Sequence, residues 1–409
     1  MKTVILYSQI VALSALSAFA GSVAAPYQIG RWEGFRTAAI AYTFDDDLPN
    51  QYAKAVPMFN AKGFKLTLFT VTSWIPNGSW SKIQAAAQYG HEIASHTVTH
   101  PNLVTGVNAT QLTNELVNSQ AAINANVPGQ KCLTLAYPNC VEPSDAVTAT
   151  YYIAARTCSG QLVSFSPGNF MSISSYVCGS QGSINSAQAF NNLADSAAAS
   201  GSWCVYLIHA IDGDNGYSPL ASSNLQASVD YLSTNQPKFW VESFGHIARY
   251  IKERNATSVA ETANTGDSIT LQVTNNLDNT IYNVPITLRR PLPANWPAAA
   301  VSQNNAPIIP QLVSTNSTNY VMFDVVPNGG DVTLTRTALP PVLSTPTFIT
   351  PTNFTFRLDG QTGVVYAIAT SSDLQNWSSV QTNLLVSTST NFTFEISDPW
   401  QFYRAQWIP

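Results

Sequence analysis

The chain has 409 residues and a formal net charge of −5, and only 10% of its residues are Asp, Glu, Lys or Arg, well below the roughly 25% that is usual. The sparse charge and the absence of a basic run argue against nucleic acid or an anionic membrane surface as a partner, and leave neutral polymers as the easier partner. The length predicts two or three domains.

Residues 1–20 are predicted to be a secretory signal peptide. An apolar run over 5–19 ends in the small-x-small pattern Ala18-Phe19-Ala20, which is typical of a cleavage site, and cleavage after Ala24 or Ala25 is the alternative. The run is shorter than the roughly 20 apolar residues that cross a bilayer, so we expect no membrane span. We therefore expect a secreted, extracellular protein, with the periplasm or the cell surface as alternatives.

Residues 26–254 are predicted to form an α/β domain. Apolar, β-branched runs typical of buried parallel strands lie at Ala38–Phe44, Lys65–Val71, His91–Ser95, Leu133–Tyr137, Tyr151–Ala155 and Trp203–Ile208. Helical patterns lie at Gln51–Ala61, Trp80–Tyr89, after Asn108, and at Ala187–Ala199, Leu220–Leu232 and Val241–Glu253. The alternation favours a (β/α) barrel or a doubly wound sheet.

The remaining residues are predicted to form two small all-β domains. Over 255–340, short alternating runs such as Ser268–Thr274, Val284–Leu288 and Tyr320–Val325 indicate a β-sandwich. Pro340, Pro341 and Pro346 suggest a linker at the start of residues 341–409. Strands of a C-terminal β module are expected there at Phe354–Leu358, Val364–Ala369, Trp377–Gln381 and Phe392–Ile396.

The chain has five cysteines. In the oxidising compartment expected for a secreted protein, pairs of cysteines tend to form disulfides. We predict the disulfides Cys132–Cys140 and Cys158–Cys178, because each pair closes a short loop, and we predict that Cys204 is a buried free thiol. A cysteine-ligated zinc site is disfavoured because the chain has no C-x-x-C spacing.

Polar residues gather at the predicted strand ends. Asp45, Asp46 and Asp47 follow the first strand, His96 follows His91–Ser95, and His209 follows Trp203–Ile208. The active sites of barrels are built at the carboxyl ends of their strands. A solvated acidic turn is the alternative reading of the three aspartates.

His96 and His100 have the four-residue spacing of metal ligands. If this segment coils into one helical turn, both imidazoles project from the same face. The zinc-protease pattern His-Glu-x-x-His does not fit, because His91-Glu92 is followed by His96, one position too late.

These residues resemble the motifs of the NodB-homology polysaccharide deacetylases, carbohydrate esterase family four. The first motif corresponds to Thr43-Phe44-Asp45-Asp46, the second to His96-Thr97-Val98-Thr99-His100, and the fifth to Leu207-Ile208-His209. The resemblance covers about residues 36 to 254 and implies an irregular (β/α) barrel. It also implies a hydrolase that removes acetyl groups from a carbohydrate polymer.

The resemblance implies a role for each motif residue. Asp46, His96 and His100 would hold a divalent metal, Asp45 would be the base, a charged His209 the acid, and Leu207 would line the acetyl-methyl pocket. Two imidazoles and a carboxylate leave positions open on the ion for a water whose pKa falls to about 7. Zinc is the first choice of metal, and cobalt, nickel and manganese accept the same ligands.

The chain departs from the family at the third and fourth motifs. The third is here Ala136-Tyr137-Pro138-Asn139, and we expect the Asn139 N–H to be the oxyanion donor. The fourth, Asp-x-x-Asp-Trp, is not found, so Arg156 is the candidate to pair with Asp45, with a surface arginine as the alternative.

Substrate contacts are expected from Tyr137, Arg156, Leu207, Asp214 and Tyr217, with Trp74 and Trp80 as further candidates for stacking on sugars. The sequence does not separate N-deacetylation of chitin or peptidoglycan glycans from O-deacetylation of xylan-type polymers. A carbohydrate-binding protein on an inactive barrel is the alternative from another class. The oligomeric state is left open.

Overall fold

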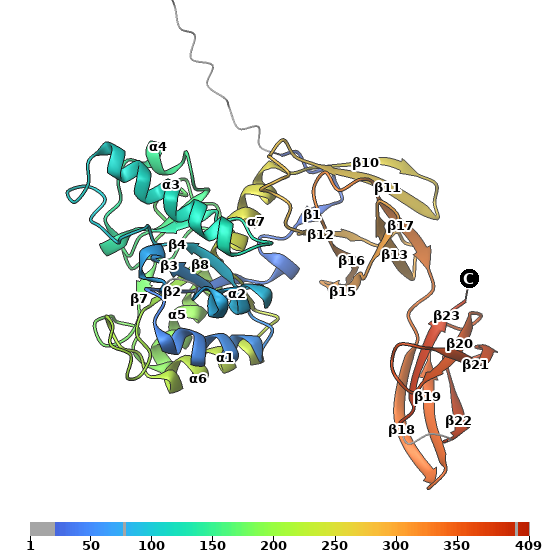
Figure 1. The fold of residues 1–409 in the computed structure, drawn as a ribbon. Coiled ribbons are helices and arrows are strands. Elements are labelled where there is room, and N and C mark those ends of the chain that lie inside the picture. Colours follow the sequence, from blue (N-terminus) through green and yellow to red (C-terminus); the bar gives the residue numbers. More distant parts are fainter. Residues whose placement is uncertain (1–20, 77–78, 397–399, 409) are drawn as a thin grey trace, which may run out of the picture.

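The computed structural model describes residues 21–76, 79–396 and 400–408, so the predicted signal peptide lies outside the described residues. It contains an α/β part, a neighbouring pair of β-sheets and a C-terminal β module (Figure 1). Among the described residues, none of the helices has the length and apolar character needed to cross a lipid bilayer.

The α/β part is built on a parallel sheet with the strand order β6-β5-β4-β3-β2-β8-β7, and β9 also pairs with β2. Strand β2 is buried along its whole length, as its apolar sequence predicts. The strands are β2 (Ala38–Asp45), β3 (Thr67–Thr70), β4 (Glu92–Ser95), β5 (Thr134–Ala136), β6 (Ala154–Arg156), β7 (Tyr176–Val177), β8 (Trp203–Ile208) and β9 (Phe239–Val241).

The segment that leads into β7 closes the sheet into an irregular barrel. Ile173 bridges to Arg156 at the end of β6, and Tyr176 and Val177 then pair with β8. The same short stretch therefore contacts both outer strands of the sheet. The (β/α) barrel expected from the motifs is confirmed.

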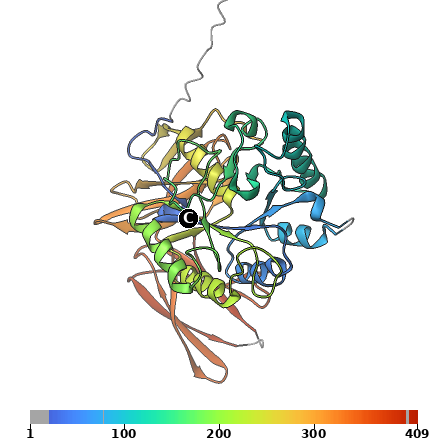
Figure 2. The same ribbon diagram turned by 90° about the vertical axis from the view of Figure 1, so that its left-hand side faces the viewer.

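Helices surround the sheet (Figures 1 and 2). They are α1 (Val56–Asn60), which follows a π-helical turn at Gln51–Ala55, α2 (Ser81–Gln88), α3 (Ala109–Asn126), α4 (Asp145–Thr148), α5 (Ala187–Ser200), α6 (Ser222–Thr234) and α7 (Phe244–Ala256). Helix α3 begins after Asn108, whose side chain forms a capping box with Gln111. Leu116 and Ile123 on its predicted apolar face are buried in the barrel core.

One element of the barrel was placed wrongly from the sequence, and two others were missed. The strand predicted at Tyr151–Ala155 begins only at Ala154, because Tyr151 and Tyr152 still donate backbone bonds to Thr148 in the turn after α4. Strand β7 has two residues, too few for a periodic pattern. Strand β9 takes the first residue of the helix predicted at Val241–Glu253.

The second part consists of two antiparallel sheets. One has the order β1-β12-β16-β15 and the other β10-β11-β17-β13-β14. Their strands are β1 (Gln28–Ile29), β10 (Ser258–Asn264), β11 (Ser268–Thr274), β12 (Ile286–Pro291), β13 (Ala298–Gln303), β14 (Ala306–Ile308), β15 (Gln311–Thr315), β16 (Thr318–Val325) and β17 (Val332–Thr337).

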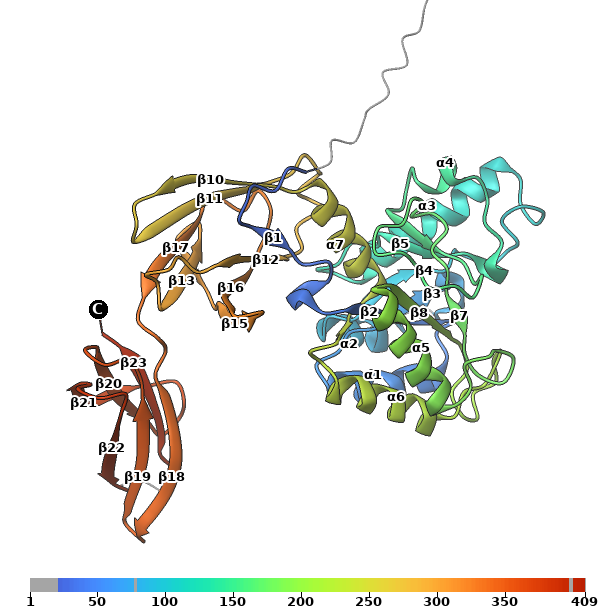
Figure 3. The ribbon, with the colours of Figure 1, turned by 180° about the vertical axis from the view of Figure 1, so that it is seen from behind.

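The sandwich packs directly on the barrel through helix α7, which lies between the two parts (Figure 3). Phe244 and Ile247 of α7 belong to the same buried cluster as Trp203 of the barrel and Leu271 of the sandwich. Strand β1, which precedes the barrel in sequence, pairs with β12 of the sandwich. Side chains of the barrel, of α7 and of the sandwich therefore form one continuous apolar cluster, separate from the core that contains Leu116 and Ile123.

The C-terminal module has two three-stranded sheets, β18-β19-β22 and β21-β20-β23. Its strands are β18 (Val342–Thr350), β19 (Asn353–Asp359), β20 (Val365–Ser371), β21 (Ser378–Leu384), β22 (Ser389–Glu395) and β23 (Phe402–Trp407). The linker expected around Pro346 is wrong, because β18 already begins at Val342. The proline is accommodated where the register with β19 shifts between Ser344 and Thr347.

The predicted disulfide pairing is also wrong. The structure joins Cys140 to Cys158 and leaves Cys132, Cys178 and Cys204 as buried thiols, so only the prediction for Cys204 is confirmed. Cys140 and Cys158 follow the neighbouring parallel strands β5 and β6 and meet beyond the same edge. Cys132 lies before β5, at the opposite end of that strand. Short loops in sequence were therefore a poor guide, because parallel pairing decides which strand ends meet.

Candidate active site

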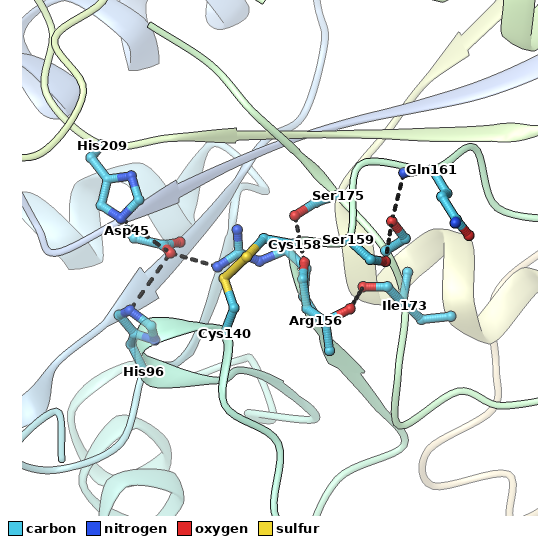
Figure 4. Close-up of a disulfide and its surroundings, with 12 residues drawn as sticks. Asp45, His96, Cys140, Arg156, Cys158, Ser159, Gln161, Ile173, Ser175 and His209 are labelled. Carbon is cyan, nitrogen blue, oxygen red and sulfur yellow. Dashed lines mark hydrogen bonds and ion pairs between the residues drawn. A yellow bond between two sulfur atoms is a disulfide. The ribbon is translucent and has the colours of Figure 1, made fainter. Parts of the chain in front are cut away.

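The polar residues at the strand ends converge on one place. Asp45 ends β2, His96 follows β4, Arg156 ends β6 and His209 follows β8. Their side chains point toward one another across the carboxyl edge of the sheet (Figure 4). The parallel topology thus assembles a site from segments far apart in sequence, as the strand-end pattern predicted.

Asp45 lies at the centre of this group and is 2% exposed. Its Oδ2 accepts a hydrogen bond from Arg156 Nη2 and lies 3.6 Å from His96 Nε2 and 3.8 Å from His209 Nε2. Burial alone would raise the pKa of Asp45, but the Arg156 guanidinium, with a smaller effect of His96 and His209, holds it below its usual value. Asp45 is therefore kept as a carboxylate.

Asp46, His96 and His100 form a cluster whose ligand atoms lie within 4.8 Å of one another. Asp46 Oδ1 is 3.8 Å from His96 Nε2 and 4.0 Å from His100 Nε2. This oxygen is buried and has no hydrogen-bond partner among the described residues. An unpartnered carboxylate oxygen between two imidazoles fits a divalent cation.

The orientation of His96 supports that fit. Its Nδ1 lies 2.8 Å from the carbonyl oxygen of Ala136 at the end of β5. A carbonyl only accepts, so Nδ1 carries the proton and Nε2 turns its lone pair toward Asp46. Burial lowers the pKa of His96 to about 4, so the ring is neutral, the form that binds a metal.

Charge in the cluster is poorly balanced by the protein itself. Burial, with the neighbouring Asp45 and Asp47 carboxylates, raises the pKa of Asp46 to about 7, and burial lowers the pKa of His100. Two adjacent acids thus face two imidazoles that resist protonation. A bound cation removes this conflict, since it favours the carboxylate and the neutral imidazoles alike.

The segment that carries His100 is a loop and not the helical turn considered from its spacing. Thr97 and His100 have φ angles of 69° and 60°, which non-glycine residues rarely adopt. Glu115 of α3 holds this loop from outside: its Oε2 accepts from the N–H groups of Val98 and Thr99, and its Oε1 from the Thr99 hydroxyl. His96 and His100 are thus brought together by a loop that Glu115 holds in place.

Two residues near the site have structural roles that the sequence did not reveal. Asp47 accepts hydrogen bonds from Tyr52, Thr70 and the Val71 N–H, which tie the end of β2 to β3, and burial raises its pKa to about 6. Gln51 donates from Nε2 to the carbonyl oxygens of Asp45 and His209. No motif marks Gln51; only its complete burial in a polar setting does.

His209 and His100 each lie beside an exposed aromatic ring. The Tyr217 ring lies 5.0 Å from that of His209, edge to face, and the Trp74 ring lies 5.4 Å from that of His100. Tyr217 is 52% exposed and Trp74 51%. Both rings are therefore free to stack on a ligand, whereas Trp80 packs against the barrel core.

His209 itself makes few polar contacts. Its Nδ1 is buried without a hydrogen-bond partner among the described residues. Burial lowers the pKa of His209, an effect that Asp45 partly opposes. The charged form expected from the motif thus depends on its acidic neighbours, since Asp46 Oδ2 is 3.9 Å away.

The other residues predicted to contact the substrate or the oxyanion differ in their exposure to solvent. Tyr137 and Leu207 are buried at 1% exposure, Leu207 near the end of β8 and Tyr137 directly after β5. Asn139 is exposed in the turn that follows. Asp214 accepts from the N–H groups of Asn50 and Ile211 and so holds its own loop.

Comparisons with known proteins find a similarity in the first part of the barrel. The family model described as polysaccharide deacetylase matches residues 34–154. The resemblance is thus confirmed over the first part of the barrel, which includes Asp45, Asp46, His96 and His100 but not His209. A gellan lyase from a Bacillus species is 27% identical over 340 residues, which are 77% of this chain and 13% of that protein. The chain thus spans only a small part of that relative's length.

Solved structures of deacetylases are more distantly similar. The Xyl-CE4 domain of a multidomain xylanase from the hindgut metagenome of Trinervitermes trinervoides is 19% identical, with a TM-score of 0.38 over 51% of this chain and 88% of that chain. A CE4 family pseudoenzyme from Bacillus anthracis is 15% identical, with a TM-score of 0.37 over 51% of this chain and 65% of that chain.

Proposed function

We propose that this chain, which carries a polysaccharide deacetylase domain, is a secreted, metal-dependent hydrolase that removes acetyl groups from a carbohydrate polymer. The observation that supports the proposal most is the convergence of Asp45, Asp46, His96, His100, Arg156 and His209 at one edge of the barrel. An inactive barrel would be expected to have lost at least one of these residues, and this chain retains all of them.

Asp46, His96 and His100 would hold the metal, and zinc is our first choice because its preferred ligands are imidazole and carboxylate. A divalent ion there supplies an acidified water and polarises the acetyl carbonyl. Asp45, held as a carboxylate by Arg156, takes a proton from the attacking water. This task contributes about 10²–10⁴-fold in rate.

His209 donates a proton to the leaving group. It lies across Asp45 from His96, and Gln51 binds the carbonyl oxygens of both His209 and Asp45. The acid and the base are therefore fixed relative to each other through the backbone. In this scheme the Asn139 N–H stabilises the oxyanion, and Leu207 lines the pocket for the acetyl methyl group.

The exposed rings of Trp74 and Tyr217, beside His100 and His209, suit a chain of sugars that crosses the site. Apolar faces of pyranose rings pack on aromatic rings, so the two side chains would bracket the acetylated residue. The proposal concerns acetylated polysaccharides as a class and includes both acetyl amides and acetyl esters.

Acetate release is the direct test. The purified protein, loaded in turn with zinc, cobalt, nickel and manganese, should release acetate from chitin oligomers, from acetylxylan, or from both. Release from acetylxylan alone would identify an O-deacetylase, and release from chitin oligomers alone an N-deacetylase. Binding to these polymers without any acetate release would reject the hydrolase in favour of a carbohydrate-binding protein.

A further inference from the structure

The turn after β5 has an unusual backbone conformation. Asn139 and Cys140 are consecutive and have φ angles of 56° and 60°, in the left-handed region that costs energy for residues other than glycine. Two such residues in a row form a turn of type I′, in which asparagine is common, whereas cysteine is rarely found with a positive φ. The two internal bonds of the turn, Cys140 N–H to Tyr137 and Val141 N–H to Pro138, bind it only to itself.

The external support comes from strand β6. The Cys140–Cys158 disulfide joins the turn to a residue two positions after Arg156, with a Cα–Cα distance of 5.7 Å. On the other side of the turn, the Tyr137 N–H donates to the carbonyl oxygen of Arg156 at 3.2 Å. The turn is therefore held at one end by strand β6, which carries the partner of Asp45, and at the other by the segment directly after β6. Figure 4 shows the disulfide beside Arg156 and Asp45.

The anchor on the Cys158 side is itself rigid. Thr157 and Ile173 are joined by backbone bonding, and the Ser175 hydroxyl donates to the Thr157 carbonyl. Ser159 donates to the Ser174 hydroxyl, which also accepts from the Gln161 N–H. The disulfide thus links a strained turn to a segment that has little freedom to follow it.

The turn presents a backbone donor that the protein does not use. No acceptor for the Asn139 N–H is found in the part of the chain that the structure describes. Ala136, three positions earlier, is the residue whose carbonyl oxygen fixes His96. An unused N–H in a turn that directly follows the strand ending at Ala136 has the properties of a preorganised oxyanion donor.

We propose that the Cys140–Cys158 disulfide is a positioning element of the active site, which holds the Asn139 N–H and Arg156 in fixed relation to Asp45. This inference rests on the proposed function, because it assigns the disulfide to that site. Without the covalent link, the turn relaxes from its left-handed conformation and the Asn139 N–H turns away. Binding of the metal by Asp46, His96 and His100 is unchanged, since none of them is on the turn.

Reduction of the intact protein tests this directly. A water-soluble phosphine cleaves the disulfide to two thiols and takes up the oxygen of a water molecule as it becomes the phosphine oxide. Phosphine is used because dithiols bind zinc. Removing one oxyanion-hole donor lowers kcat by about 10²–10³-fold, and a loosened turn should lose about 10- to 100-fold, with metal content unchanged and KM changed less than kcat.

The matched variants separate positioning from bulk stability. Cys140→Ser with Cys158→Ser should show the lowered kcat without treatment and should no longer respond to phosphine. Cys132→Ala removes a buried free thiol and should keep both the full kcat and the response. A lowered melting temperature with an unchanged kcat, in the reduced protein and in the double variant, would show that the disulfide is merely structural and would overturn the proposal.

Hydrogen–deuterium exchange gives a reading that needs no substrate. Peptides that cover residues 137–141 should exchange faster after reduction, while those that cover His96 and His100 should not change. Equal exchange before and after reduction contradicts the proposal even if the oxidised protein is fully active. If the oxidised protein releases no acetate from any polymer, the proposed function fails, and exchange still decides whether the disulfide holds the turn.

Discussion

Arg156 and Asp45 form a buried ion pair between two strands that are not neighbours in the sheet. Nη2 of Arg156, at the end of β6, donates to Oδ2 of Asp45 at the end of β2, and the two side chains are 1% and 2% exposed. Nε and Nη1 of Arg156 have no partner among the described residues. Asp45 is thus the main anion available to this guanidinium, and each charge depends on the other.

Replacing Arg156 with Met should abolish acetate release and destabilise the protein. Losing one partner of a buried pair costs about 3–5 kcal/mol, because the other charge stays buried without compensation. Arg156→Lys keeps the charge but not the planar donor geometry, and should lower kcat by at least about 10-fold. Kinetics and urea unfolding measure both effects, with the exposed pair of Arg336 and Asp267 probed by Arg336→Met as the control. Full activity in Arg156→Met would reject the role given to the pair.

Asp46→Ala or His96→Ala should remove both the metal and the activity. Each substitution takes one of three ligands from the cluster, and the remaining two are too few for tight binding. Elemental analysis after dialysis measures the metal, and calorimetric titration with zinc measures its affinity. His91→Ala is the control, because His91 is bonded to Asn60 and the Leu66 N–H on another part of the barrel. An unchanged metal content in Asp46→Ala would show that the cluster is not the site.

Glu115→Gln should weaken metal binding although Glu115 touches no ligand side chain. The amide retains one acceptor oxygen but replaces the other with an N–H₂ donor, so the contacts to Val98 and Thr99 between the two histidines are partly lost. Loss of such outer partners typically costs about 10- to 100-fold in metal affinity. Zinc titration of the variant checks this, with the exposed Glu142→Gln as the control. Equal zinc affinities in the two variants would show that the loop between His96 and His100 keeps its conformation without Glu115.

Much of the barrel was predictable because its longer strands have a clear sequence signal. The run Ala38–Phe44 is apolar on both faces, and the motif residues directly after it and its neighbours locate the site. Strand β9 and the two-residue β7 were missed, because three or two residues carry no period. The α/β class and the meeting of the strand ends followed from the pattern, whereas the choice of a barrel over a doubly wound sheet came from the resemblance of the motifs.

The parts that failed depend on contacts between distant segments. The Cys140–Cys158 link follows from the pairing of β5 with β6, which loop length does not reveal. Glu115 and Gln51 act through backbone groups of other elements, so their residue type gives no signal. Arg156 was recognised as a partner of Asp45 only because its strand was expected to end at the same edge.

We expect the Glu253 carboxyl to make the free energy of unfolding depend on pH. This residue of α7 is fully buried, its Oε1 accepts from the Val284 N–H at 3.1 Å, and its Oε2 has no partner among the described residues. Burial raises the pKa of Glu253 to about 7, although the Val284 N–H and the nearby Arg249 act against this. The folded protein therefore keeps this proton at pH values where the unfolded chain has released it.

The sign follows from proton binding. Below the ordinary pKa of 4.5 both states are protonated, and Glu253 adds no pH dependence. Between that value and about 7 the folded state binds more protons, so stability falls as pH rises, by at most about 1.4 kcal/mol per pH unit for one group. Above pH 7 both states are ionised and the loss is complete.

Glu253→Gln should therefore gain stability relative to the wild type as the pH rises from 4.5 to 7, because glutamine keeps an acceptor for the Val284 N–H and carries no charge. Urea unfolding at a series of pH values measures the difference between the two proteins, which cancels the contributions of other acids such as the half-buried Glu242. Asp331→Asn, on an exposed side chain of the sandwich, should give a difference that does not change with pH. A flat difference for Glu253→Gln as well would mean that the Glu253 carboxyl is already ionised in the folded protein at pH 5.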